Sequence, residues 1–294
     1  MKPTFLHIAL LAVVALSVSC KEELAPESIF VDPVSKKTDF DLWLDRHYVE
    51  PYNIRFEYRL PDRETHFNYW VTPPPVAKAV EVAKVIEYTT LEALVELMSH
   101  NEKIADPSVF AKTYFPKVLY LVGSYEIDFD GTVVLGSAEN GLQINILGVT
   151  NFDRTKGDGG IAGLLLHEFT HILDGQHPVT GEYRAIGAGD YVGDTYTSAD
   201  DTYLQKGFLS NYARSSPAED IAVTCAALIG ESDAWWNSRL QAAGEEGRTK
   251  LENKRTILKA WLRESYGVDW ELWHTIYTRR LGSLENIDWD TLED

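Results

Sequence analysis

Apolar side chains recur every three or four residues along most of the chain, a spacing that places them on one face of a helix. This pattern predicts helices at residues 39–48, 76–99, 108–114, 217–229, 232–240, 247–266 and 270–281. Pro51 is expected to end the first helix, since proline lacks the N–H group that would continue it. Thr89 and Thr90 are expected to interrupt the second. Six of the eight tryptophans follow residue 230, and their spacing predicts packing in the core.

Four stretches have the pattern of strands, at residues 52–60, 118–122, 131–136 and 142–147. The first alternates apolar and polar side chains, as a half-buried strand does, and Pro61 should end it. Residues 138–141 (AENG) are expected to form a hairpin turn between the last two strands. Residues 177–206 are rich in Gly, Asp, Thr and Tyr without periodicity, and are expected to form a long loop of the kind that is often functional.

Residues 164–173 (LLLHEFTHIL) combine an apolar helical run with one H-E-x-x-H motif. The helix should begin after residues 158–160 (DGG), end near Gly175 and be buried, because it is apolar nearly all round. His167 and His171 are four residues apart, so both imidazoles can face one metal ion. Glu168 lies beside them, where it can act as the general base of a zinc hydrolase.

A catalytic zinc site needs a third protein ligand, and His177 is one candidate. It lies ten residues after His167, the spacing of the metzincin class of zinc peptidases. That class has glycine where this chain has Asp174, whereas the glycine here is Gly175. It also has a methionine-containing turn after the motif, and the last methionine here is Met98.

Glu219 is the second candidate for the third ligand, and the one we favour. Ser216 before Pro217 predicts a helix start, which puts Glu219 in the first turn of a second helix. Tyr212 lies seven residues before Glu219. The alternative is that Glu219 is an ordinary first-turn acid, which the helix dipole favours, and that Tyr212 is a packed loop aromatic. Asp220 is a further candidate, to orient one of the histidines.

The H-E-x-x-H motif followed by Tyr212 and Glu219 resembles the lethal-factor-like branch of the gluzincin metallopeptidases. The H-E-F-T-H-I-L and N-Y-A-R-S-S-P-A-E-D runs, with the N-terminal signal described below, resemble zinc-binding metallopeptidase lipoproteins of the Bacteroidetes. Some of these are named substrate import-associated zinc metallohydrolases, for their link to TonB-dependent nutrient uptake. After Glu219 the chain departs from lethal factor, because residues 221–225 lack that protein's further acidic residue.

The resemblance implies an α+β, zincin-like fold, in which a small sheet packs on the H-E-x-x-H helix and an edge strand borders the cleft. It implies Zn²⁺ held by His167, His171 and Glu219, with Glu168 and Tyr212 as catalytic residues. An extended peptide or protein substrate could then pair with the edge strand. The alternative is a non-catalytic zinc-binding accessory lipoprotein of an uptake system. A hydrolase of another amide or ester would use the same metal chemistry.

The N-terminus has the pattern of a secretory signal, with Lys2 followed by an apolar run at residues 5–16 and then small residues before Cys20. This resembles a bacterial lipobox, although Ser17 stands where leucine is commonest; the alternative is a plain signal peptide. The charged residues that follow Cys20, Lys21, Glu22 and Glu23, resemble the surface-export signal of lipoproteins in the Bacteroidetes. We therefore expect a signal peptide at 1–19, lipidation at Cys20, a polar tether at 20–38, and an outer-membrane, surface-facing protein with an outer-membrane uptake complex as a candidate partner.

The remaining residues, 39–294, are expected to form one catalytic domain, with an α/β part at 39–210 and a helical part at 211–294. The chain has 294 residues, 45% of them hydrophobic, which is enough to bury a sizeable core. Its formal net charge of −18 repels phosphate backbones and argues against nucleic acid as a partner. Cys225 lies in an apolar stretch and is expected to be a buried thiol without a disulfide partner.

Overall fold

The computed structural model describes residues 37–60, 70–127, 133–134, 136–139, 142–198 and 201–292. Asp39–Asp294 forms one compact unit. The predicted signal peptide and Cys20 lie outside the described residues, as does the tether up to residue 36. Within the described residues, no helix is both long and apolar enough to span a bilayer.

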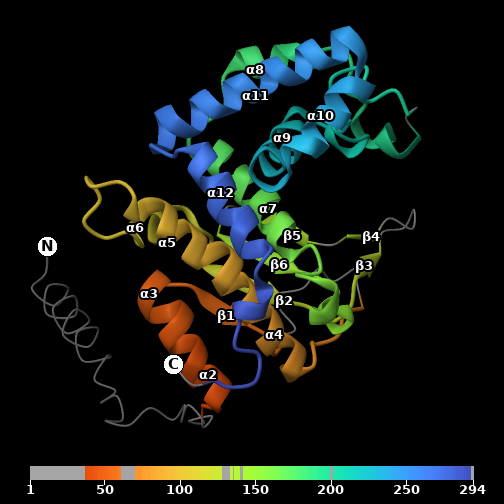
Figure 1. The fold of residues 1–294 in the computed structure, drawn as a ribbon. Helices are drawn as coiled ribbons and strands as arrows, with labels where there is room; N and C mark the ends of the chain where they lie inside the picture. Colours follow the sequence, from red (N-terminus) through yellow and green to blue (C-terminus); the bar gives the residue numbers. More distant parts are fainter. Residues whose placement is uncertain are drawn as a thin grey trace, which may run out of the picture. The chain divides into compact units, whose positions relative to one another are not determined.

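A small four-stranded sheet lies on one side of this unit (Figure 1). Its strands, in spatial order, are β1 (Arg55–Glu57), β2 (Val118–Leu121), β6 (Gln143–Ile146) and β5 (Gly136–Glu139). The first three run parallel, and β5 pairs antiparallel with β6, opposing Ser137 to Asn145. Strands β3 (Glu126–Ile127) and β4 (Val133–Val134) form a separate antiparallel pair.

The strand predictions at 118–122 and 142–147 are confirmed within a residue or two, but the predicted strand 131–136 and the predicted turn 138–141 need correction. Residues 131–136 do not form one strand: Val133 and Val134 pair with β3, whereas Gly136 begins β5. Residues 138–139, predicted as a turn, extend β5 because hydrogen bonds to β6 override the weak strand preference of Ala and Glu. The other two turn residues, 140–141, lie outside the described residues.

Helices connect β1 to β2, as a parallel crossover requires. They are α4 (Val76–Ile86), the π-helical turn η3 (Glu87–Leu91), α5 (Glu92–Ser99) and α6 (Val109–Tyr114). The interruption predicted at Thr89 and Thr90 is confirmed as η3. A short connection, η4 (Val149–Asn151) and η5 (Arg154–Lys156), then leads from β6 toward the next helix.

The first helix runs past the proline that was predicted to end it. It consists of α2 (Asp39–Leu44), the π-helical η1 (Asp45–Val49) and α3 (Glu50–Tyr52). Glu50 closes the π-turn by donating its N–H to Asp45, so the missing donor of Pro51 falls in the first turn of α3, where it is tolerated. Asn53, with φ of 55°, ends the helix and shortens the predicted strand 52–60 to β1.

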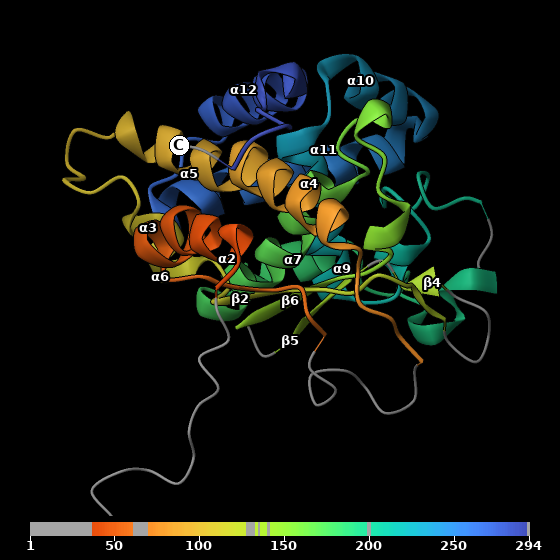
Figure 2. The same cartoon turned by 90° about the horizontal axis from the view of Figure 1, so that it is seen from below.

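The H-E-x-x-H motif lies in α7 (Ile161–Gln176). Asp158 caps this helix by accepting the N–H groups of Gly160 and Ala162 at 3.2 and 2.8 Å. The helix continues one residue beyond the predicted stop at Gly175, because His177 still donates its N–H to Leu173. It lies between the sheet on one side and α4 and α5 on the other (Figure 2). This position explains why apolar residues cover nearly its whole surface.

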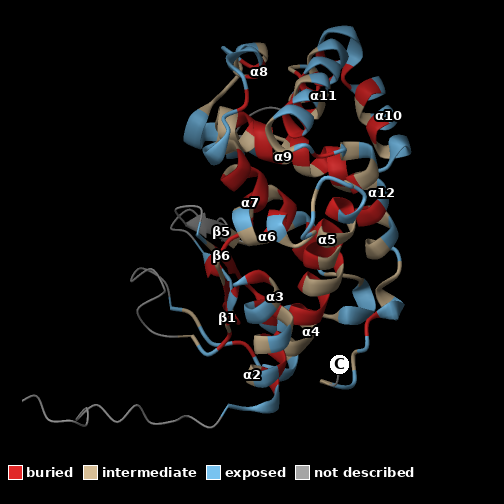
Figure 3. Ribbon diagram, turned by 90° about the vertical axis from the view of Figure 1, so that its left-hand side faces the viewer, coloured by how far each residue is buried: buried red, intermediate tan, exposed pale blue. Residues whose placement is uncertain are grey.

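The C-terminal part is helical. It contains α9 (Pro217–Gly230), α10 (Asp233–Ala242), α11 (Gly244–Tyr266), α12 (Trp270–Leu281) and the 3-10 turn η8 (Leu284–Asn286). Helix α9 packs along α7, and α12 contacts α9 and α5; α7, α9 and α12 carry much of the buried surface (Figure 3). Trp236, Trp261 and Trp273 are buried as predicted.

The predicted loop at 177–206 contains helical structure that its sequence pattern did not predict. Helix α8 (Gly181–Ile186) is anchored by Tyr183, which is fully buried against α11. The 3-10 turns η6 (Gly193–Ser198) and η7 (Tyr212–Arg214) follow. The fold is therefore a mixed one, in which helices surround a small, mostly parallel sheet, in agreement with the α+β prediction.

Candidate metal centre

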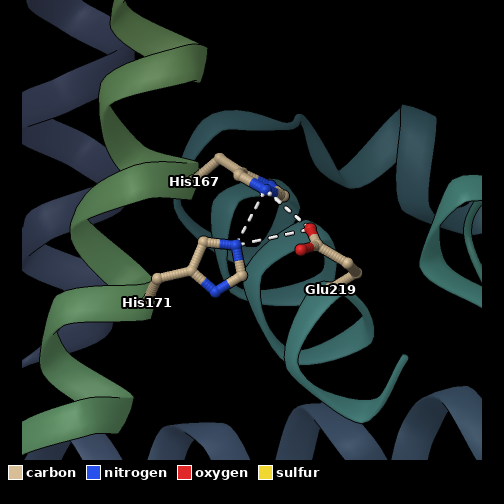
Figure 4. Close-up of side chains that lie close together, drawn as sticks. All are labelled: His167, His171 and Glu219. Atoms are coloured by element: carbon tan, nitrogen blue, oxygen red, sulfur yellow. Dashed lines mark hydrogen bonds and ion pairs between the residues drawn. The ribbon is translucent and has the colours of Figure 1, made fainter. Parts of the chain in front are cut away.

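Two histidines of α7 face the same point. His167 and His171 are one helical turn apart, and their Nε2 atoms lie 3.1 Å from each other. Both side chains are mostly buried, with 16% and 23% of their surface exposed. Figure 4 shows both rings directed toward the neighbouring helix α9. The arrangement predicted from the i, i+4 spacing is therefore present.

Helix α9 supplies the third side chain of the cluster. Ser216 caps this helix by accepting the N–H of Glu219 at 3.2 Å, and Pro217 occupies the first turn. This start fixes Glu219 opposite the histidines. One carboxylate oxygen, Oε2, lies 3.0 Å from Nε2 of His167 and 3.3 Å from Nε2 of His171 (Figure 4).

The three atoms form a triangle that matches the demands of a zinc ion. Zinc–ligand bonds of about 2.0–2.2 Å in tetrahedral geometry place ligand atoms about 3.3–3.6 Å apart. The observed separations of 3.0–3.3 Å are close to that spacing. Within the described residues, this is the only group of three histidine, cysteine or acidic side chains close enough to hold a metal. The donor set, two imidazoles and a carboxylate, suits zinc.

The cluster also brings ionisable groups together at a mostly buried site. Burial opposes ionisation of Glu219, but hydrogen bonds with His167 and His171 outweigh it and hold the pKa of this carboxyl well below its usual range. Burial lowers the pKa of His171, yet the same carboxylate more than offsets this and leaves it raised. Glu219 is thus an anion that stabilises positive charge at the His171 imidazole, as it would stabilise a metal cation.

Glu168 and Tyr212 lie at the edge of the cluster. Glu168 is buried, with 6% of its surface exposed, and Tyr212 is 42% exposed. The ring of Tyr212 lies 6.1 Å from that of His167, between centroids. Burial and the carboxylates of Glu219 and Glu168 raise the pKa of the Tyr212 hydroxyl, which keeps it protonated and able to donate a hydrogen bond.

The structure does not bring His177 into the cluster. This exposed residue follows α7, and its ring packs edge-on against Tyr266 at 5.2 Å. Its carbonyl accepts a hydrogen bond from the Trp261 indole at 2.7 Å. The geometry thus favours Glu219 over His177 as the third candidate ligand.

Asp220 does not orient a histidine, as the sequence had suggested it could. Its carboxylate instead receives Lys254 of α11 at 2.7 Å, together with hydrogen bonds from Tyr191 at 3.0 Å and Thr224 at 3.4 Å. Lys254 and Asp220 are both fully buried. This pair holds α11 against the first turn of α9, where Glu219 lies. Sequence reasoning missed Lys254, because it is one of several basic residues in α11 and nothing distinguishes it from its exposed neighbours.

The comparisons with known proteins agree with this geometry. The model of a family described as "Putative zinc-binding metallo-peptidase" matches residues 33–271. The chain belongs to this family. A crystal structure of a protein from Bacteroides caccae ATCC 43185, given the same description, matches at 30% identity with a TM-score of 0.73. The match covers 90% of this chain and 100% of that one. No curated protein matches the chain.

In this member of the zinc-binding metallo-peptidase family, His167, Glu168 and Tyr212 also line a cleft of about 820 Å³. The cleft follows the groove between α7 and α9 and reaches α10 and α12. Gly136, at the start of the edge strand β5, borders it. A Cβ atom at Gly136 would lie 2.8 Å from the side chain of Leu164, so glycine allows β5 to approach α7 closely.

Proposed function

We propose that this chain is a zinc-dependent metallopeptidase of the gluzincin type, with a zincin-like arrangement of sheet and metal-binding helix. The observation that supports this most strongly is the triangle of His167, His171 and Glu219, whose spacing suits tetrahedral zinc. Glu168 and Tyr212 at its edge favour catalysis over structural metal binding, because holding a metal requires neither of them.

The roles of the residues follow from their positions. Zinc held by His167, His171 and Glu219 would supply Lewis acidity, which polarises a substrate carbonyl and makes water more acidic. Glu168 accepts a proton from the attacking water and later delivers it to the leaving amine. The Tyr212 hydroxyl donates a hydrogen bond to the oxyanion that develops on the carbonyl oxygen.

A peptide is the substrate that the surroundings of the site favour. Strand β5 lies at the end of the sheet, and its first residue borders the cleft. An extended peptide could pair with such an edge, while its scissile carbonyl reaches the metal centre. Amides or esters other than peptides would use the same metal chemistry, so the digestion below includes them.

We further propose that the protein is anchored in the outer membrane through lipidated Cys20 and faces the cell surface. Acyl chains attached to one cysteine would anchor it, since each buried CH₂ contributes about 0.8 kcal/mol. A partnership with an outer-membrane uptake complex would follow from the resemblance to nutrient-import lipoproteins. The acidic charge of the chain continues to argue against nucleic acid as a partner.

Metal analysis combined with digestion tests the proposal. We expect the purified protein to hold zinc and to cleave members of a broad peptide library, and a chelator to abolish the cleavage until zinc is restored. A parallel panel of amide and ester substrates should show weaker turnover. Zinc binding without cleavage of any library or panel member would instead support a non-catalytic accessory lipoprotein.

A further inference from the structure

The cleft beside the metal centre has a chemically distinct far end. Near the metal it is lined by His167, Glu168 and Tyr212, whereas its middle is apolar. The apolar walls come from α7, α9, α10 and α12, and consist mainly of Leu164, Val223, Ala226, Ala227, Trp235 and Leu281. Trp235, expected in the core, is half-buried here and presents part of its ring to the cleft. A long apolar stem can therefore lie in this middle section.

The far end carries two carboxylates, Asp158 before α7 and Glu231 after α9. Both are only partly buried. Asp158 accepts the backbone N–H groups of Gly160 and Ala162 at the start of α7, which leaves lone pairs for a further donor. Within the described residues, no lysine or arginine lines the cleft, and neither carboxylate forms an ion pair. The carbonyl end of α9 adds a negative partial charge beside Glu231, whereas Asp158 neutralises the positive end of α7.

Tyr277 of α12 marks the same end independently. Tyr277 is buried, with only 3% of its surface exposed, and it lines the cleft. Within the part of the chain that the structure describes, its hydroxyl has no hydrogen-bond partner. Burial, with Asp158 and Glu231 nearby, raises the pKa of this hydroxyl, so it stays neutral and can accept a hydrogen bond. The hydroxyl is open to solvent in the cleft, so a ligand there can replace water as its hydrogen-bond partner.

We propose that this cleft is a specificity pocket for a long cationic side chain, arginine or lysine, of a residue that flanks the scissile bond. The methylene stem would lie along the apolar walls, and the charged head would donate hydrogen bonds to Asp158, Glu231 and Tyr277. This deepens the proposed peptidase function and rests on it, because it names the class of substrate that the same site prefers.

The length of the cleft is consistent with such a side chain. His167 lies six residues after Ile161, the first residue of α7, which corresponds to roughly 9 Å along the helix axis. The Asp158 carboxylate reaches this first turn, because its Oδ2 accepts the N–H of Ala162 at 2.8 Å. A short side chain held at the metal centre would leave the carboxylates without a partner, whereas the three- or four-methylene stems of arginine and lysine extend toward them.

Digestion of a peptide library by the zinc-loaded full chain, with cleavage sites read by mass spectrometry, tests the inference. We expect arginine or lysine to be enriched at one position next to the cleaved bond. For a peptide with arginine there, Glu231→Gln should lower kcat/KM by about 10- to 100-fold, the range expected for a lost charge-assisted hydrogen bond. Asp158→Asn, which keeps a side-chain oxygen to cap α7, should have a similar effect.

Two controls separate recognition from general damage. The same peptide with norleucine in place of arginine should be cleaved equally well by the wild type and by Glu231→Gln. Glu245→Gln removes one charge from an exposed position in the first turn of α11, away from the cleft, and should leave the arginine preference unchanged. Binding of the arginine peptide to Glu168→Gln, measured by calorimetry, should weaken to the same extent when Glu231→Gln is added.

The failures can be told apart. Metal-dependent cleavage with apolar or acidic residues preferred at both flanking positions would overturn the specificity pocket and leave the peptidase proposal intact. Absence of any cleavage would instead count against the peptidase, and the calorimetric comparison would then decide whether the cleft recognises a cation. Equal binding of the arginine and norleucine peptides would overturn the inference in that case.

Discussion

At the scale of single residues, the cluster of His167, His171 and Glu219 predicts which side chains determine zinc affinity. Glu219→Ala removes one of three proposed ligands, and we expect zinc affinity to fall by more than about 100-fold, since even outer-sphere partners contribute 10- to 100-fold. His177→Ala is the matched control, because His177 packs on Tyr266 outside the cluster. A competition titration with a zinc chelator measures both. Equal losses in the two variants would contradict the assignment of Glu219.

The charges in the cluster predict how zinc binding depends on pH. Zinc needs the neutral imidazole of His171, and Glu219 leaves the pKa of that imidazole raised. Protons should therefore compete with zinc from a higher pH than at an ordinary histidine, and affinity should fall as the pH drops from about 8 to about 5.5. The pKa of Glu219 lies far below this window, so the carboxylate stays ionised throughout. Zinc affinity that is constant across the window would contradict this account.

The sequence predicted only part of this site. The histidine pair followed from a spacing of four residues, and the Ser216–Pro217 start placed Glu219 on a second helix. Both predictions rest on neighbouring residues within one helix, whose geometry follows directly from the sequence spacing. Asp158, Glu231 and Tyr277 come from three separate elements, and their meeting depends on how α7, α9 and α12 pack. No local pattern encodes that packing, so the far end of the cleft could not be foreseen.

At the scale of elements, the ion pair between Lys254 and Asp220 joins α11 to the start of α9. Burial lowers the pKa of Lys254 and raises that of Asp220, and their mutual attraction opposes both shifts. Lys254 also donates to the carbonyl of Gly207 at 2.7 Å, and its ammonium lies 3.9 Å from the ring centroid of Phe208. The position of Glu219 therefore depends in part on a lysine far along the chain.

Breaking that pair should be costly. Lys254→Met leaves Asp220 buried without its cation, and we expect the free energy of unfolding to fall by about 3–5 kcal/mol. Adding Asp220→Asn should restore part of the loss, because no buried charge then remains. Arg263→Met, at an exposed position of the same helix, should change stability by less than about 0.5 kcal/mol. Urea denaturation measures all three variants. An unchanged midpoint for Lys254→Met would show that the pair does not stabilise the fold.

The elements themselves were predicted unevenly, and the reasons are physical. Helices with a continuous apolar face, such as α9 and α12, were predicted within about a residue. The strands were harder, since pairing partners far apart in sequence decide where β4 ends and β5 begins. The predicted helix end at Pro51 was wrong because a π-turn places Pro51 in the first turn of α3, where the helix does not need its backbone N–H. Helix α8 escaped prediction because residues distant in sequence anchor it: Tyr183 is buried against α11, and Arg184 pairs with Asp174 of α7.

At the scale of the whole molecule, the proposed lipid anchor predicts that the protein stays with the membrane, whereas an enzyme without the anchor would be secreted in soluble form. Cys20→Ala should remove the site of lipidation and shift the protein from the membrane fraction to the soluble one. Cys225→Ala makes the same chemical change at the buried thiol of α9 and should leave the protein with the membrane. Cell fractionation followed by immunoblotting checks both. Retention of Cys20→Ala in the membrane fraction would contradict lipid anchoring at this residue.

The central claim is that the cluster binds zinc and that Glu168 uses it for hydrolysis. Turnover of a cleaved peptide by Glu168→Gln, measured beside its zinc content, tests this most directly. We predict full zinc occupancy with kcat lowered by about 100-fold or more, because the substitution removes the proton acceptor but none of the ligands. His167→Ala should lose both zinc and activity. Wild-type turnover by zinc-loaded Glu168→Gln would contradict the account.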